Sequence, residues 1–184
     1  MKGYKMKILF FSDIHGVPST LSKVLEHADN LNVDRLVILG DLLYHGPRNG
    51  VPDFYDPKKV AEMLNSRKNM ILTVQGNCDC EVDQMMLEFP VLSSYAELAV
   101  GDKRFFLTHG HVYNAGNLPP VPDNTVIVHG HTHIPEKREL EDGIVIFNPG
   151  SISLPKNNHP RTFGLYEDGE LSIRLLDDAS VYIK

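Results

Sequence analysis

Short apolar runs alternate with amphipathic stretches in the first half of the chain. The runs at residues 7–12, 35–39 and 70–75 are almost continuously apolar and predict buried strands. Between them, apolar residues recur at helical spacing; these are Leu21, Val24, Leu25, Ala28 and Leu31 in one stretch, and Val60, Ala61 and Leu64 in the other. Asp56 and Pro57 suit the N-cap and first position of the second helix. Strands and helices in this alternating order predict a parallel sheet with right-handed crossovers.

The second half of the chain has turn residues between short strands. Gly101-Asp102, Asp142-Gly143 and Asp168-Gly169 each separate two apolar runs and predict three hairpins. A further apolar run at 125–128 predicts another buried strand. Together the two halves predict an α/β fold, a two-sheet α/β sandwich with helices on the outer faces. We expect residues 1–184 to form one domain.

Composition narrows the class of protein. The chain has 184 residues, with 42% apolar and 23% charged, which is typical of a globular domain. The apolar runs are too short for a membrane span, and the first residues do not resemble a signal peptide. Cys78 and Cys80 are the two cysteines and lie too close for a useful disulfide, so we expect a reducing, cytoplasmic setting.

The net charge of −6 argues against a broad nucleic-acid-binding surface. It does not exclude a phosphorylated substrate, because bound cations can dominate the charge of a single cleft.

Five strand ends carry residues that commonly bind metals. They are Asp13 with His15, Asp41, Asn77, His109, and His131 with His133. An isolated His-x-His pair is often only a surface pair, but five such strand ends should converge at one edge of a sheet. Oxygen and imidazole ligands suit manganese, iron or zinc. Seven ligands are too many for one tetrahedral ion, so the pattern predicts two ions that share a bridging carboxylate.

These residues resemble the motifs of the calcineurin-like metallophosphoesterases, in particular the small bacterial and archaeal phosphodiesterases. The motifs appear in order as Asp13-Ile14-His15, Gly40-Asp41, Gly76-Asn77-Cys78-Asp79, His109 and Gly130-His131-Thr132-His133. The segment Asn148-Pro149-Gly150-Ser151 also resembles a loop of the small members. The resemblance therefore extends over most of the chain, and five motifs in order are a specific match.

The resemblance implies a binuclear phosphodiesterase in which a hydroxide bridging the two ions attacks phosphorus. One ion would be held by Asp13, His15, Asp41 and His133, and the other by Asp41, Asn77, His109 and His131. Manganese is the expected metal, with iron, zinc, nickel or cobalt as alternatives. The expected partner is a small phosphodiester, with no membrane; association into a homo-oligomer stays open. The alternatives are a phosphomonoesterase (a protein phosphatase or nucleotidase) and, less favoured, a non-catalytic scaffold like the retromer subunit of this fold.

Cys78 stands where most of the family has a phosphate-contacting histidine, a substitution that some small members share. It is the candidate catalytic residue, although a space-filling role is equally plausible. Two dications nearby would push its thiol toward the thiolate, so we expect diesters to be better substrates than monoesters. Asp79 is expected to cap the following helix or to orient a neighbour. Arg48 and Arg161 are candidates for phosphate contact, and His45 and His159 for lining the cleft.

Overall fold

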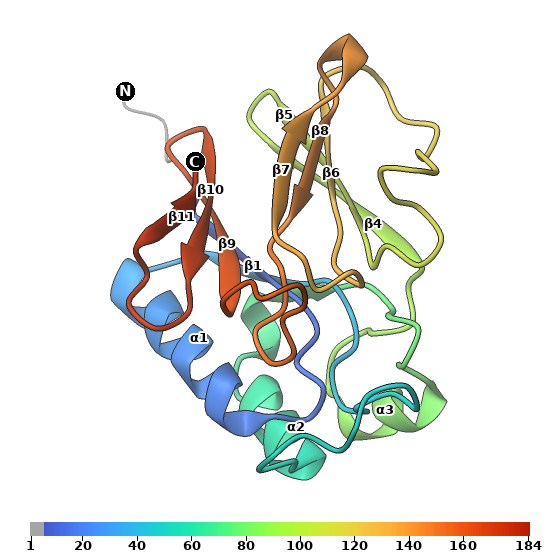
Figure 1. Ribbon diagram of the computed structural model, residues 1–184, viewed down its shortest axis with the longest axis vertical. Helices are drawn as coiled ribbons and strands as arrows, with labels where there is room; N and C mark the ends of the chain where they lie inside the picture. Colours follow the sequence, from blue (N-terminus) through green and yellow to red (C-terminus); the bar gives the residue numbers. More distant parts are fainter. Residues whose placement is uncertain (1–5) are drawn as a thin grey trace.

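The computed structural model describes residues 6–184, which form two β-sheets packed face to face (Figure 1). The first sheet has the strand order β11-β10-β9-β1-β2-β3. Its strands are β1 (Ile8–Phe11), β2 (Arg35–Ile38), β3 (Ile71–Thr73), β9 (Thr162–Glu167), β10 (Glu170–Leu175) and β11 (Val181–Ile183). Strands β1, β2 and β3 are parallel to one another, as the alternation of strands and helices predicts. Their carboxyl ends therefore lie at one edge of the sheet.

The second sheet has the order β4-β5-β6-β8-β7. Its strands are β4 (Tyr95–Val100), β5 (Lys103–Thr108), β6 (Thr125–Val128), β7 (Glu136–Glu139) and β8 (Val145–Asn148). The pairs β4 with β5, β7 with β8, and β9 with β10 are antiparallel, which confirms the three hairpins. Asp168 and Gly169 both have positive φ at their turn, the backbone that tight hairpins require. Strands β5 and β6 are parallel, so their carboxyl ends also share an edge.

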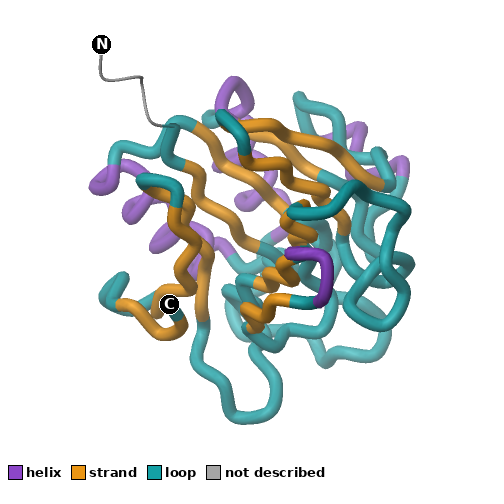
Figure 2. The backbone as a smooth tube through the Cα atoms, turned by 90° about the horizontal axis from the view of Figure 1, so that it is seen from above, coloured by secondary structure: helices purple, strands orange, loops and turns teal. Residues whose placement is uncertain are grey.

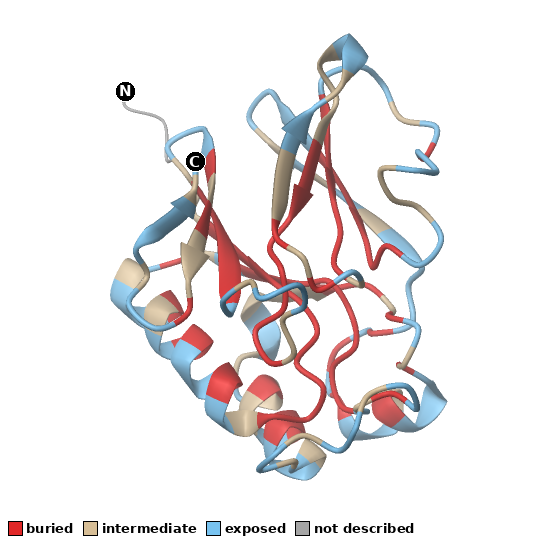
Figure 3. Ribbon diagram, viewed as in Figure 1, coloured by how far each residue is buried: buried red, intermediate tan, exposed pale blue. Residues whose placement is uncertain are grey.

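Helices α1 (Pro18–Leu31) and α2 (Pro57–Asn65) cover the outer face of the first sheet (Figures 1 and 3). The predicted apolar residues of both helices are buried there, except that Leu31 is only partly so. The Asp56 carboxylate caps α2 by accepting the backbone N–H of Lys59 at 2.9 Å. A short α3 (Glu81–Met86) follows the third motif. The outer face of the second sheet is covered differently, by residues such as Tyr113, Ala115 and Val121 of the loop after β5.

One core lies between the first sheet and helices α1 and α2, and a second lies between the two sheets and includes several phenylalanines. The ring of Phe10 on β1 lies 5.8 Å from that of Phe105 on β5 and 6.0 Å from that of Phe147 on β8. Seen from above, the strands occupy the middle of the molecule and helices and loops surround them (Figure 2). This confirms the predicted two-sheet α/β sandwich. The pattern did not predict β11, a short edge strand paired with β10. Among residues 6–184, no helix is long and apolar enough to cross a bilayer.

Candidate metal centre

The loops that leave five strands meet at one end of the sandwich. Asp13 follows β1, Asp41 follows β2, Asn77 follows β3, and His109 directly follows β5. His131 and His133 lie on the loop after β6. Backbone hydrogen bonds join neighbouring loops: Asp13 donates to the Gly40 carbonyl at 3.2 Å, and Gly130 donates to the His109 carbonyl at 2.8 Å. The structure therefore brings together all seven residues that the sequence singled out.

Five of these residues have left-handed backbone. Their φ angles are 59° for Asp13, 49° for His15, 56° for Asp41, 66° for His131 and 61° for His133. Residues with a Cβ rarely adopt this conformation, and such strain concentrates at functional sites. The backbone thus turns sharply at each position to present a side chain to the shared cleft.

The four atoms of a first donor set lie close together. They are Asp13 Oδ1, His15 Nε2, Asp41 Oδ2 and His133 Nε2. His15 Nε2 lies 3.8 Å from Asp13 Oδ1, 3.7 Å from Asp41 Oδ2 and 3.5 Å from His133 Nε2. His133 Nε2 lies 3.2 Å from Asp13 Oδ1. A second donor set comprises Asp41 Oδ1, Asn77 Oδ1, His109 Nε2 and His131 Nδ1. His109 Nε2 is its centre, at 3.5 Å from Asp41, 3.1 Å from Asn77 and 3.2 Å from His131.

Asp41 belongs to both donor sets through different oxygens. Its Oδ2 faces His15 and its Oδ1 faces His109. The Asp41 side chain is almost fully buried, and Gly76 packs so tightly against it that an added Cβ would collide with Oδ1. The glycine of the third motif is therefore needed for the close approach of two loops. This is the geometry that a bridging carboxylate requires.

Three imidazoles are oriented by backbone carbonyls. The Nδ1 atom of His15 donates to Tyr44 at 2.9 Å, that of His109 to Leu39 at 2.6 Å, and that of His133 to Leu154 at 2.5 Å. Each of these bonds places the ring proton on Nδ1, which leaves the Nε2 lone pair directed into the cleft. This arrangement is typical of histidines that bind metals.

The surroundings of the buried oxygen Asp13 Oδ1 indicate whether the two donor sets suit cations. Asp13 is fully buried, and with His133 neutral and its ring proton on Nδ1, Asp13 Oδ1 has no hydrogen-bond donor within the described part of the chain. A buried carboxylate oxygen without a donor is costly, and a cation would satisfy it. Three overlapping groups have donor atoms within 4.8 Å of one another: Asp13 with His15 and His133, Asp13 with Asp41 and His109, and His15 with Asp41 and Cys78. The residues present fit a site for divalent cations.

The electrostatics of the cleft couple Asp13 to His133. Burial alone would raise the pKa of Asp13, but contact with His133 and the neighbouring imidazoles holds that pKa well below its usual range. Burial alone would lower the pKa of His133, but the interaction of His133 with the Asp13 carboxylate has the larger effect, so the pKa of His133 is raised. Burial, with the neighbouring His109, lowers the pKa of His131 to about 4. His131 is therefore neutral at pH 7, as a metal ligand must be.

Asp79 supports the loops from behind. Its carboxylate accepts the backbone N–H groups of Asp41 at 2.8 Å, Leu42 at 2.8 Å and Gly76 at 2.7 Å. It does not cap α3, because Cys80 occupies the N-cap position. Of the two roles expected for Asp79, the structure therefore shows the orientation of neighbours.

The segment that begins at Asn148 supports the histidine loop in a similar way. The buried Asn148 amide donates to the Gly130 carbonyl and to Thr132 Oγ1, both at 2.9 Å. Ser151 Oγ donates to the Asp13 carbonyl at 3.1 Å. Leu154, a few residues on, accepts the His133 ring proton. The sequence signalled this support only as the quoted motif Asn148-Pro149-Gly150-Ser151, without indicating what it contacts.

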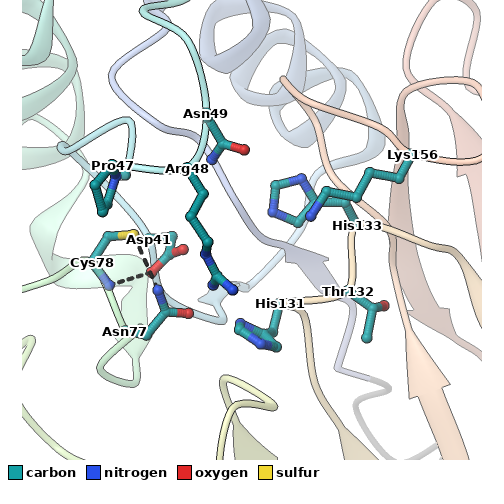
Figure 4. Close-up of a pocket in the computed structure, with 11 residues that line it drawn as sticks. Asp41, Pro47, Arg48, Asn49, Asn77, Cys78, His131, Thr132, His133 and Lys156 are labelled. Atoms are coloured by element: carbon teal, nitrogen blue, oxygen red, sulfur yellow. Dashed lines mark hydrogen bonds between the residues drawn. The ribbon is translucent and has the colours of Figure 1, made fainter.

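A pocket of about 370 Å³ opens above the two donor sets (Figure 4). Besides the site residues, Arg48 and Asn49 line one side of it and Lys156 the other. Arg48 is therefore in the cleft, as expected. Arg161 lies outside the pocket lining, with its Nε 3.4 Å from the Ser153 carbonyl. The sequence did not single out Lys156, since a lone lysine in a loop carries no distinguishing pattern.

Cys78 lies half-buried at the edge of the pocket. Its backbone N–H donates to Asp41 Oδ1 at 2.9 Å, and its thiol accepts from Asn77 Nδ2 at 3.2 Å. Burial and the Asp41 carboxylate raise the pKa of the thiol to about 12. The protein surroundings thus favour the neutral thiol, which opposes the expected push toward the thiolate. The thiol also turns the Asn77 amide so that its oxygen faces His109.

Three further histidines, including the candidates His45 and His159, lie outside the pocket lining. The His45 ring packs between Tyr44 and Tyr55. His159 contacts the Tyr182 hydroxyl at 3.0 Å. His129 is buried behind the histidine loop, with its Nδ1 3.1 Å from the Gly130 carbonyl. Neither His45 nor His159 therefore lines the cleft.

Comparisons with known proteins agree with this geometry. Residues 6–169 match the family model described as the calcineurin-like phosphoesterase superfamily domain. Phosphodiesterase YfcE of Escherichia coli K12 is 45% identical over 176 residues, which cover 96% of this chain and 95% of that protein. Phosphodiesterase MJ0936 of Methanocaldococcus jannaschii is 27% identical, over 79% of this chain and 83% of that protein.

Solved structures give the same picture. The structure of YfcE from E. coli superimposes with a TM-score of 0.93 at 44% identity, covering 96% of this chain and 97% of that one. Vacuolar protein sorting 29 from Cryptosporidium parvum has a TM-score of 0.64 at 19% identity, covering 98% and 96% of the two chains. At that identity, the second likeness shows the fold alone.

Proposed function

The chain belongs to the calcineurin-like phosphoesterase superfamily, and on that basis we propose that it hydrolyses small phosphodiesters with two divalent metal ions. The first ion would be held by Asp13, His15, Asp41 and His133. The second would be held by Asp41, Asn77, His109 and His131.

The observation that carries this proposal is the position of Asp41. Its two oxygens face two different donor sets, at 3.7 Å from His15 and 3.5 Å from His109. A structural ion would need one closed set of ligands, whereas two adjacent sets that share a carboxylate and open into a pocket suit catalysis. Two further observations support the same activity. The chain is 45% identical to a phosphodiesterase over nearly its whole length, and it has a buried cluster of possible metal ligands.

When bound, two divalent ions would provide a water-derived nucleophile at neutral pH and stabilise negative charge on the phosphoryl oxygens. The chain's own residues hold and orient the reactants. Asn77 contributes a neutral oxygen, which keeps the cleft less anionic and so more receptive to phosphate. Arg48 reaches over the pocket between Asp41 and His131 (Figure 4), and this position supports a contact with a phosphoryl oxygen.

Cys78 gives the site its substrate preference. A neutral thiol supplies neither a cation for a second phosphate charge nor an acid matched to neutral pH. We therefore expect diesters with good leaving groups to react faster than monoesters, for which the usual histidine would matter more. A phosphomonoesterase stays the alternative within the same chemistry. A scaffold role is less favoured, because this chain keeps both donor sets intact.

We propose manganese as the metal and the cytoplasm as the cellular setting. Mixed carboxylate, amide and imidazole donors suit manganese. Cys78 and Cys80 are free thiols, which supports a reducing setting.

An assay after metal removal tests the proposal. The purified protein is treated with chelator and then given Mn²⁺, with bis(p-nitrophenyl) phosphate and p-nitrophenyl phosphate as matched substrates. We expect no turnover without metal, restored turnover with Mn²⁺, and faster hydrolysis of the diester. A His15→Gln variant should lose activity, while His159→Gln, a histidine outside the pocket, should keep it. Equal turnover in chelator and in Mn²⁺ would contradict the two-metal mechanism.

A further inference from the structure

We propose that the pocket contains a second anion site built on Lys156, so that the preferred diester carries a further phosphate or carboxylate group apart from the scissile phosphorus. This proposal rests on the phosphodiesterase function above and names the class of its substrate.

The two cations of the pocket come from different loops. Arg48 belongs to the loop after β2, and its turn is held by the Asn49 amide, which donates to the His45 carbonyl at 2.8 Å. Lys156 belongs to the segment after β8, and its backbone N–H donates to the His133 carbonyl at 3.3 Å. Arg48 thus reaches into the pocket between Asp41 and His131, and Lys156 reaches in beside His133 (Figure 4).

Neither cation is neutralised by a protein acid. Within residues 6–184, neither Arg48 nor Lys156 forms an ion pair or a side-chain hydrogen bond. Six other lysines and arginines, such as Lys7 and Arg67, pair with a carboxylate. What distinguishes Arg48 and Lys156 from other unpaired cations, such as the exposed Lys58 and Lys103, is that both line the pocket. In a chain with a net charge of −6, acids to pair with are plentiful. Asp41 is the one acid among the described lining residues, and it faces the two donor sets.

The charge of a simple diester does not match this pocket. Such a substrate has one negative charge, and that charge lies at the scissile group, where Arg48 and, when bound, the divalent ions would contact it. Lys156 then remains without an anion, on the wall beside His133. A substrate with a second anionic group would place that group near Lys156. A monoester would not, because both of its charges lie on the phosphorus.

A matched pair of diesters tests this inference. The substrates are thymidine 5′-(p-nitrophenyl phosphate) and its 3′-phosphorylated analogue, with release of nitrophenolate as the readout and Mn²⁺ as the metal. The analogue should have a KM lower by about fivefold, the size expected for one partly exposed charge pair. Lys156→Gln should remove this ratio, and Lys156→Arg should retain it. Lys59→Gln, which removes an exposed lysine of α2, should leave the ratio at the wild-type value.

A binding measurement separates this proposal from the hydrolytic one. Adenosine 3′,5′-bisphosphate and adenosine 5′-monophosphate are titrated by calorimetry into the metal-free protein in chelator. The bisphosphate should bind about fivefold more tightly to the wild type and no more tightly than the monophosphate to Lys156→Gln.

The outcomes divide clearly. If the wild type hydrolyses both diesters with equal KM and binds both nucleotides equally, the second anion site is wrong while the phosphodiesterase function stands. If the protein hydrolyses neither diester, the proposed function fails, and the nucleotide titration still decides whether Lys156 binds an anion. A preference that survives in Lys156→Gln would overturn the assignment to this lysine.

Discussion

The carboxylate of Asp79 accepts a hydrogen bond from the backbone N–H of Asp41 at 2.8 Å, so that one buried acid fixes the position of another. The same carboxylate accepts the N–H of Gly76, which precedes Asn77. Asp79 therefore joins the loops after β2 and β3 without facing the cleft. Burial raises its pKa to about 6, while the three N–H donors favour its charged form.

Replacing Asp79 should loosen both donor sets. Asp79→Asn puts an amide with only one acceptor oxygen opposite three N–H donors, so at least one buried donor loses its partner. We expect the free energy of unfolding to fall by about 1–3 kcal/mol and metal affinity to fall by about 10–100-fold. Urea unfolding and metal titration measure the two effects. Asp53→Asn, at an exposed loop position, is the control, and unchanged metal affinity in Asp79→Asn would refute the positioning role.

Asp41 and Asn77 should differ in their effect on metal content. Asp41→Asn removes the carboxylate shared by both donor sets, so nearly all activity should be lost. Asn77→Ala removes one neutral ligand of the second set and should be partly rescued by excess Mn²⁺. Elemental analysis after dialysis provides the measurement. Retention of two metals per chain in Asp41→Ala would show that the assignment of the bridging residue is wrong.

Metal removal should leave a folded protein. The core between the sheets is built from residues such as Phe10, Phe105 and Phe147, which belong to the strands and not to the donor loops. Chelator should therefore abolish turnover and lower Tm by linkage, while the thermal transition stays cooperative. Calorimetry with and without Mn²⁺ tests this. A metal-free protein with no cooperative transition would instead indicate that the ions are structural.

Metal affinity should rise with pH because of the Asp13–His133 pair. The pKa of His133 is raised in the metal-free protein, so the stability from its protonated form is present at low pH and lost as the pH rises through that pKa. A metal must displace this proton, and we expect about one proton released per chain at pH 6 and fewer at pH 8.5. Calorimetric titration in two buffers of different ionisation enthalpy counts the protons. Equal release at both pH values would contradict the assignment to His133.

Cys78→His should change which substrates are preferred. The imidazole restores a group that can protonate a leaving oxygen and carry a positive charge, and acid catalysis is worth about 100-fold or more. The ratio of the monoester rate to the diester rate should therefore rise, and both rates should depend less on the leaving-group pKa. A series of substituted phenyl esters measures both quantities. Because the Cys78 thiol also contacts the Asn77 amide, metal content should be checked in the same variant.

Much of this protein follows from its sequence alone. The parallel strands and hairpins follow from local patterns, because buried strands need continuous apolar residues and tight turns need residues that tolerate positive φ. The seven candidate ligands were also visible, since each follows a predicted strand and parallel strands align their carboxyl ends. That residues 1–184 form one domain remains a prediction.

Only the tertiary structure shows the contacts between residues that lie on different loops. Which oxygen of Asp41 faces which histidine depends on the crossing of loops from two sheets. The role of Asn148 depends on contacts with Gly130 and Thr132, far away in sequence. The sequence does not indicate that Lys156 lines the pocket. Only the folded loop places this lysine beside His133 and away from the acids that could pair with it. Hydrophobic periodicity in the sequence indicates which face of each helix or strand is buried. The chemistry of the cleft depends instead on the distances between side chains of different elements.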